Sequence, residues 1–223
     1  MAMGDPTLEG LLRAIGEGDQ SARQALTDYL VERGDDRSER VRTAQSLSDV
    51  LDYFLPQGWI SRIKRRLQEN GFQCIEGPTY PCSHFVRPGH LTRATYWTDA
   101  DNLYHVFAIK DFASLDLRTF KRYVSDCYRW ADNYLQEFDV GSVNLCSFAI
   151  AAVPEIDLRL ADHVRRRKLD SHISFSPNRD GYEIPMIYAS SRQELHFFQT
   201  MPIFFNRVIY QGCRDAIQAM LIS

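Results

Sequence analysis

The sequence predicts an α+β protein in which helices flank a mixed central sheet and a small all-helical unit precedes them. Three observations lead to this prediction. Apolar residues recur at helical spacing through residues 6–55, strand-length apolar runs follow at 72–76, 93–110 and 143–153, and further helical patterns separate those runs. With 223 residues, 44% of them hydrophobic, the chain can form one main core and a smaller appendage.

The charges indicate where the two units meet. Residues 1–55 contain 6 basic and 11 acidic side chains, which gives −5, whereas residues 56–223 contain 20 basic and 18 acidic, which gives +2. We therefore expect one unit over 1–55 and a second over 56–223. A net charge of −3 does not by itself indicate nucleic-acid binding. Because no apolar run has the length of a membrane span and no signal-peptide pattern is seen, we expect a cytoplasmic protein with no membrane partner.

The first unit begins with two amphipathic helical patterns within residues 6–35, separated by glycines, and residues 37–55 continue as a third helix. The pair resembles the short repeat-companion segment at the front of many planctomycete and myxobacterial proteins. The matching residues are Leu11, Ile15, Leu26, Tyr29, Leu30, Glu32, Arg33, Gly34 and Asp35. The resemblance covers roughly the first 40 positions and departs at Leu30 and Val31, where that family commonly has Trp-Leu. It implies an interaction module and no chemistry.

The second unit follows a predicted break at Pro56-Gln57-Gly58. Its expected elements, in order, are a helix at 59–70, a strand at 72–76, a Pro- and Gly-rich loop to 90, a hairpin at 93–110 with a polar turn at 99–102, an amphipathic helix at 118–136, a buried strand at 143–153, a helix at 158–168, a hairpin of strands 182–189 and 195–200, and a last helix at 203–222.

The five cysteines are an odd number, and three lie in apolar-periodic segments, so no disulfide framework is expected. The loop up to residue 90 contains Cys74, Cys82, His84 and His90, which are zinc-ligand types. However, zinc ligands usually come in pairs two to four residues apart, whereas Cys82 and His84 form a cramped pair and the other two are distant. We expect instead a half-buried cysteine, solvent-facing histidines and no metal site.

Over about half of the chain, the element order α-β-β-β-α-β-α resembles the restriction-endonuclease-like, or PD-(D/E)xK, nuclease superfamily. The resemblance implies a hairpin whose carboxylates bind Mg²⁺ beside a lysine that helps to activate water. Lys110 takes the place of that lysine, but Ala108 stands where the second carboxylate is expected, and the first falls at or beside Thr95. An alanine cannot bind a cation.

Three interpretations follow. In the first, the metal site has been lost and the fold serves as a binding scaffold. In the second, a displaced acid, Asp99, Asp101 or Glu76, completes a catalytic Mg²⁺ site around Lys110. In the third, the hairpin belongs to an unrelated α+β domain, and fold alone implies no function. Basic side chains that could line a nucleic-acid groove are Arg62, Lys64, Arg65, Arg66, Arg118, Lys121 and Arg122.

The leading functional hypothesis is a non-enzymatic interaction or adaptor component of a bacterial multi-protein system, built on an inactivated nuclease-like fold without a cofactor. Its partner would be another protein of that system, contacted through the N-terminal helices or through residues 182–222. The alternative is a Mg²⁺-dependent nuclease that cleaves DNA or RNA through Lys110 with Asp99 or Asp101.

Overall fold

The structure of the chain is a computed structural model that describes residues 6–35, 37–54, 56–76, 82–88, 90–96, 99–136, 143–166, 171–173, 180–200 and 207–222. The chain forms two compact units, Met1–Trp59 and Ile60–Ser223. The division lies between residues 59 and 60, inside the helix that follows the boundary expected after residue 55. Each unit is described by itself below.

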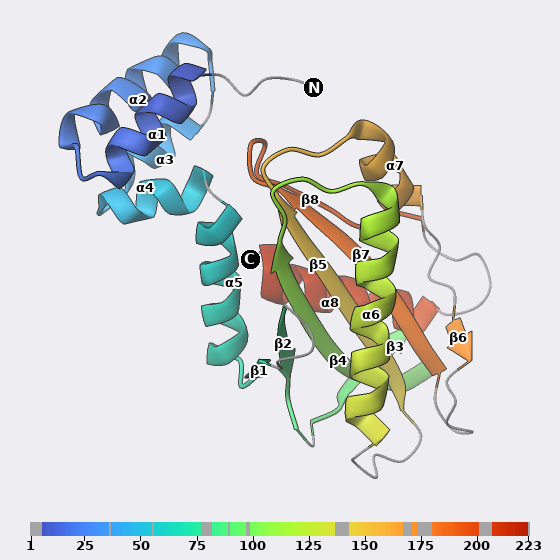
Figure 1. Cartoon of the computed structure of the whole chain (residues 1–223). Helices are drawn as coiled ribbons and strands as arrows, with labels where there is room; N and C mark the ends of the chain where they lie inside the picture. Colours follow the sequence, from blue (N-terminus) through green and yellow to red (C-terminus); the bar gives the residue numbers. More distant parts are fainter. Residues whose placement is uncertain are drawn as a thin grey trace. The chain divides into compact units, whose positions relative to one another are not determined.

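Among the described residues before Pro56, the N-terminal unit forms helices α1 to α4 (Figure 1), and the two predicted within residues 6–35 are confirmed. They are α1 (Pro6–Gly16), α2 (Gln20–Glu32), α3 (Arg37–Thr43) and α4 (Leu47–Phe54). Their apolar faces meet in a core of their own. It is formed by Ile15, Ala22, Leu26, Leu30, Val41, Val50 and Phe54.

The single helix expected over residues 37–55 is wrong, because polar contacts divide it after Thr43. The guanidinium of Arg23 on α2 donates to the carbonyl oxygens of Val41, Arg42 and Ala44 at 3.0, 2.9 and 2.5 Å, which satisfies the end of α3. Ser46 and Asp49 then exchange side-chain and backbone hydrogen bonds of 3.1 and 3.0 Å. This capping box starts α4 as a new helix.

In the part of the larger unit that the structure describes, eight strands form a mixed sheet, which confirms the expected α+β class. The strands are β1 (Gln73–Glu76), β2 (Ser83–Val86), β3 (Thr92–Tyr96), β4 (Asp99–Asp111), β5 (Asn144–Val153), β6 (Ser171–Ile173), β7 (Asp180–Ala189) and β8 (Glu194–His196). Their order is β1-β2-β4-β5-β7-β6, with β3 paired to β4 and β8 to β7. Strands β4, β5 and β7 run parallel, and the other pairs are antiparallel.

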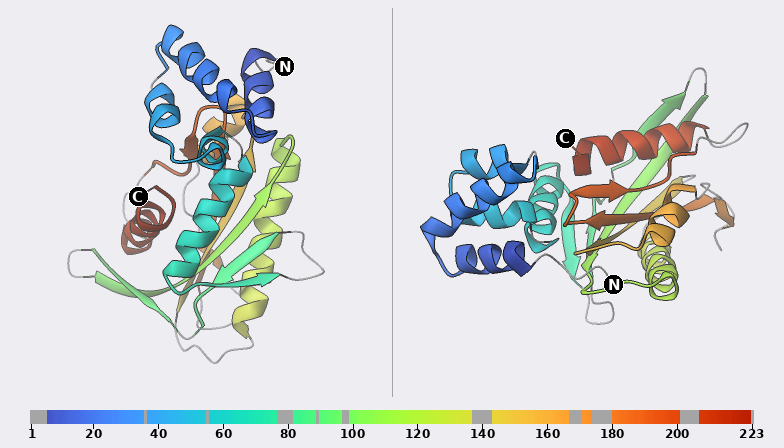
Figure 2. Two further views of the ribbon diagram at one scale, coloured as in Figure 1. Left: turned by 90° about the vertical axis from the view of Figure 1, so that its left-hand side faces the viewer. Right: turned by 90° about the horizontal axis from the view of Figure 1, so that it is seen from above.

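Helices cover both faces of this sheet, as Figures 1 and 2 show. They are α5 (Pro56–Glu69), α6 (Leu117–Gln136), α7 (Leu158–Arg166) and α8 (Arg207–Ile217), which a π-helical turn extends over Gln218–Ile222. The predicted apolar stripe of α6 is confirmed and packs with α7 on one face. Helix α8 lies on the other face, so close to the hairpin that a Cβ on Gly212 would meet Leu103 at 2.4 Å. Within the described residues, no helix has the length and apolarity needed to cross a bilayer.

Three local expectations are wrong. The tetrapeptide 99–102 is not a turn, because β4 begins at Asp99 and residues 99–103 pair with 92–96. Residues 83–86, expected in a loop, form β2 between β1 and β4, where all four side chains are buried. Pro56 starts α5 instead of ending the preceding segment, since a proline without an N–H fits the first turn of a helix.

The C-terminal part also differs from the expectation. Strand β7 is an inner strand with Ile184, Met186 and Ile187 fully buried, and it pairs in parallel with β5 over nine residue pairs. Its partner β8 is confirmed only over residues 194–196. Residues 203–206 of the expected last helix lie outside the described residues. Within residues 182–222, the described part of β7 belongs to the core and offers little surface to a partner.

One buried histidine makes stability depend on pH. His105 on β4 is 8% exposed and lies edge-on against Phe148, with ring centroids 5.5 Å apart. Burial, with smaller effects of the His90 and Arg87 charges, lowers the pKa of His105 to about 4. The imidazole is neutral in the folded state, whereas the unfolded state takes up a proton below about pH 6.5. The stabilisation of the folded state by neutral His105 is therefore complete above about pH 6.5. It is lost as the pH falls toward about 4.

We therefore predict that His105→Leu makes the free energy of unfolding less dependent on pH. Between pH 7 and pH 5 the original protein should lose about 2 kcal/mol more than the variant, from the linkage between proton binding and unfolding. Urea titrations at both pH values measure this difference. Parallel pH profiles of the two proteins would contradict it.

Candidate functional site

Lys110 lies near the carboxyl end of β4 and shares a face of the sheet with Ala108, because side chains alternate along a strand. Its side chain is half-buried, and its Nζ lies 5.0 Å from the centroid of the Phe112 ring. Helix α6 covers this face through Phe120, Tyr123 and Cys127. The surroundings of the lysine are therefore set by α6 as much as by the hairpin.

Ala108, at the position of the expected carboxylate, is fully buried beneath α6. The hydroxyl of Tyr123 lies 3.0 Å from the carbonyl oxygens of both Ala108 and Ile150, and its single proton is shared between these two acceptors. Burial raises the pKa of Tyr123 well above its ordinary value, so this hydroxyl keeps its proton. The small side chains of Ala108, Ala149 and Ala151 leave the space that the tyrosine fills.

Two of the three acids proposed as replacements, Asp99 and Asp101, are not brought to Lys110. Asp99 and Asp101 lie at the beginning of β4, nine or more residues before Lys110, so about 30 Å of strand separates them at about 3.3 Å per residue. The backbone of Asp101 pairs with Ala94, and its side chain is exposed. The side chains of Asp99 and Glu76 lie outside the described residues.

Thiols and an imidazole lie near the lysine instead. Cys82, His84 and Cys127 place their ligand atoms within 4.8 Å of one another, and Cys82 Sγ lies 3.4 Å from His84 Nε2. Cys82 directly precedes β2, His84 is within β2, and Cys127 is on α6. In an extended segment, residues two apart point to the same face, so the cramped Cys-x-His spacing aims both side chains at α6.

The four zinc-ligand types considered from the sequence do not meet. Cys74 pairs with Phe85 in the register of β1 and β2, which places it on the face opposite His84. His90 is exposed, as expected. His84, however, is only 1% exposed and its ring is stacked on Trp130 with centroids 3.8 Å apart, so the expectation of a solvent-facing side chain is wrong for it.

Two neighbouring cysteines differ in their protonation. A hydrogen bond from the Cys127 thiol, together with His84 and the charge of Lys110, outweighs burial and lowers the pKa of Cys82 to about 5. Burial raises the pKa of Cys127 well above its ordinary value, and the neighbouring Cys82 adds to this. Near neutral pH, Cys82 is therefore a thiolate and Cys127 a thiol. A half-buried thiolate can act as a nucleophile or as a ligand for a soft metal ion.

The basic side chains do not form one groove. Lys64 of α5 donates to Ser83 Oγ at 2.7 Å, and Ser83 pairs with Ile109, on the face opposite Ala108. Arg118, Lys121 and Arg122 are exposed on α6, which covers the Ala108 face. The sheet lies between the two sets, so the structure does not bring them together on one surface.

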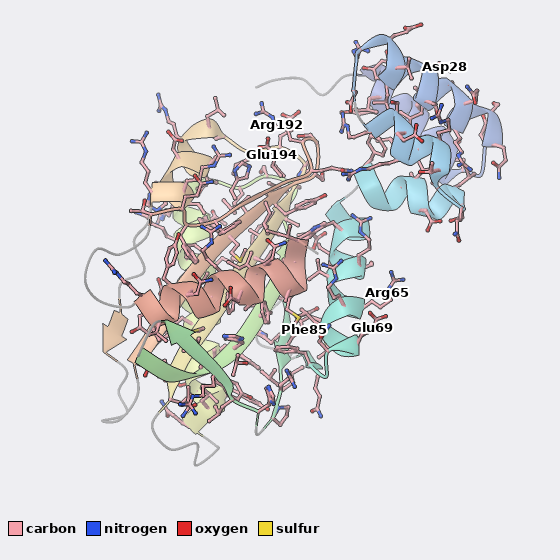
Figure 3. The ribbon with its side chains drawn as sticks, turned by 180° about the vertical axis from the view of Figure 1, so that it is seen from behind. Asp28, Arg65, Glu69, Phe85, Arg192 and Glu194 are labelled. Carbon is pink, nitrogen blue, oxygen red and sulfur yellow. The ribbon has the colours of Figure 1, made fainter. Side chains whose placement is uncertain are left out.

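Several of these basic side chains already have partners within the chain. Arg66 donates to the Met220 carbonyl oxygen at 3.4 Å. Arg65 points outward from α5 beside Glu69, 3.9 Å away, as Figure 3 shows. Arg122 lies 3.8 Å from Asp126. Arg62 lies on α5 and is half-buried.

Sequence reasoning missed Cys127 as a site residue, because it fits the apolar stripe of α6 at helical spacing. A strand assigned to residues 83–86 would have pointed to the site. In such a strand Cys82 and His84 face the same side, and another element must cover them. No spacing rule connects that strand to position 127.

Comparisons of the chain with protein-family models, with curated protein sequences and with solved structures find no match.

The contact of Tyr123 with two strands yields a stability prediction. Tyr123→Phe keeps the ring but leaves the carbonyl oxygens of Ala108 and Ile150 without this donor. It should lower the free energy of unfolding by about 1 kcal/mol, the usual contribution of a buried hydrogen bond. Tyr210→Phe is the matched control and should cost less, because its hydroxyl makes a longer contact of 3.3 Å to the Gln199 carbonyl oxygen and otherwise accepts from exposed Arg214 at 3.1 Å, both in part-buried settings. Equal losses in the two variants, measured by urea unfolding, would contradict the prediction.

Proposed function

We propose that this protein is a non-enzymatic interaction or adaptor component of a bacterial multi-protein system, with a core that resembles an inactivated nuclease. The observation that carries the proposal is the chemistry around Lys110. Buried Ala108 and the sulfur of Cys82 occupy the surroundings of its side chain, whereas Asp99 and Asp101 lie at the other end of β4.

Phosphodiester cleavage with Mg²⁺ needs oxygen ligands that hold the ion next to the attacking water. Asp111 follows Lys110 but points to the opposite face by strand alternation, and its side chain is exposed. Among the described residues, no ion pair joins Lys110 to a carboxylate. Thiols are poor ligands for Mg²⁺. These features favour a scaffold over the alternative, a nuclease that uses Lys110.

The N-terminal unit is the favoured contact surface. It has its own core, and residues 1–55 carry a net charge of −5. Among the described residues of this unit, Val31 at the end of α2 is the large apolar side chain left exposed, at 61%. A partner surface with an apolar centre and a basic rim would complement this region. Strand β7 is largely buried, so residues 182–222 offer less free surface than expected.

The proposal predicts that Val31→Lys, in the full-length chain, weakens capture of the partner from cells of the source organism by at least about tenfold, as loss of a central interface contact does. Leu158→Lys is the matched control, because Leu158 is 67% exposed on α7 in the other unit and its change should leave capture intact. Cross-linking followed by quantitative mass spectrometry compares the variants. Equal loss of partner capture in the two lysine variants would contradict the assignment of the contact to the surface around Val31.

Lys110→Ala distinguishes the scaffold from the nuclease. The change should leave partner capture and stability nearly unaltered, and neither protein should cleave plasmid, single-stranded DNA or RNA with Mg²⁺ or Mn²⁺ beyond a chelator control. Metal-dependent cleavage that Lys110→Ala abolishes would overturn the scaffold in favour of the nuclease. Cleavage that survives the change would come from a contaminant.

A further inference from the structure

We propose that Cys82, His84 and Cys127 form a zinc-binding site that joins β2 to α6. The inference goes beyond the proposed adaptor function and does not depend on it. It rests on the positions of the three side chains, on the elements that hold them and on their ligand chemistry.

The geometry of the cluster suits a tetrahedral ion. Zinc lies about 2.3 Å from cysteine sulfur and about 2.0 Å from histidine nitrogen, so neighbouring ligand atoms in a tetrahedral site are about 3.5–4 Å apart. The Cys82 Sγ to His84 Nε2 distance is 3.4 Å, and all three ligand atoms lie within 4.8 Å of one another. An ion at their centre requires only small side-chain adjustments.

The ligands are held by packing that is already in place. The ring of His84 is buried and stacked on Trp130, which is itself stacked on Tyr134 at a centroid distance of 5.3 Å. Cys127 is 2% exposed and is positioned by the buried stripe of α6. Across the sheet, His84 pairs with Ala108, so the position of β2 is fixed by its register with β4. Such support lowers the cost of assembling a metal site.

The chemistry of the donors selects the metal. Two sulfurs and one imidazole nitrogen are typical ligands for zinc, whereas Mg²⁺ and Ca²⁺ require oxygen donors. Cys82 is half-buried, as is neighbouring Lys110, so solvent reaches the cluster from their side. Three protein ligands leave the fourth position for water or another anion on that side, next to the positive charge of the lysine.

A disulfide between Cys82 and Cys127 is the competing use of the same atoms. It would consume both sulfur ligands, release two protons and two electrons, and need an oxidant. It would not use His84, whose Nε2 lies 3.4 Å from Cys82 Sγ. The zinc site uses all three side chains.

The full-length chain, reduced and dialysed against a chelator, tests the site by titration with Co²⁺ and then Zn²⁺. We expect one Co²⁺ per chain, with the thiolate-to-cobalt charge-transfer band and the visible bands of a tetrahedral site, and displacement by one equivalent of Zn²⁺. Zn²⁺ should also raise the melting temperature. This spectrum of the unaltered protein decides the matter without any variant: if the charge-transfer band is absent, the proposal is overturned.

Variants then assign the ligands. Cys82→Ser and His84→Gln should each weaken Zn²⁺ binding by at least about 100-fold, since even changes behind the ligands cost metal sites roughly 10–100-fold. Cys74→Ser and His90→Gln are the matched controls and should bind as the original protein does, because neither residue belongs to the cluster. Circular dichroism of the metal-free variants confirms that each is folded. Full binding by Cys82→Ser, or equal loss in Cys74→Ser, would refute the assignment.

Discussion

The close packing of α6 on the alanine-lined part of the sheet is the interaction on which the rest of the larger unit depends. Small side chains at 108, 149 and 151 leave space above β4 and β5, and Tyr123 fills it while donating to a carbonyl oxygen of each strand. The contact buries the position where the nuclease resemblance expects a metal-binding acid. It also brings Cys127 to the start of β2. The packing of α6 thus disfavours a Mg²⁺ site at Ala108 and creates the geometry of the Cys82, His84 and Cys127 cluster.

The alternation of side chains along paired strands decides which residues share a face of the sheet. It places His84, Ala108 and Lys110 on the face of α6, and Cys74, Phe85 and Ile109 on the face of α5 and α8. The basic residues of α5 and α6 are separated for the same reason. A positively charged groove needs its side chains on one surface, and this sheet provides two. The arrangement is consistent with a scaffold whose contacts lie elsewhere.

The two proposals share a physical basis without depending on each other. A scaffold must keep a stable shape, and a zinc ion that joins β2 to α6 would add a cross-link near the carboxyl end of β4, where Lys110 and Cys82 are both half-buried. The N-terminal helices have a separate core and a separate charge, which suits a unit that contacts a partner by itself.

The sequence by itself determined the α+β class, the two helices within residues 6–35, the amphipathic face of α6 and the buried strand at 144–153, because each depends on a local repeat of apolar residues. Only the tertiary structure decided the strand at 83–86, the separation of Asp101 from Lys110 and the meeting of Cys82, His84 and Cys127. Strand register and helix docking are set by contacts between residues far apart in the chain. Periodicity carries no information about which distant elements meet.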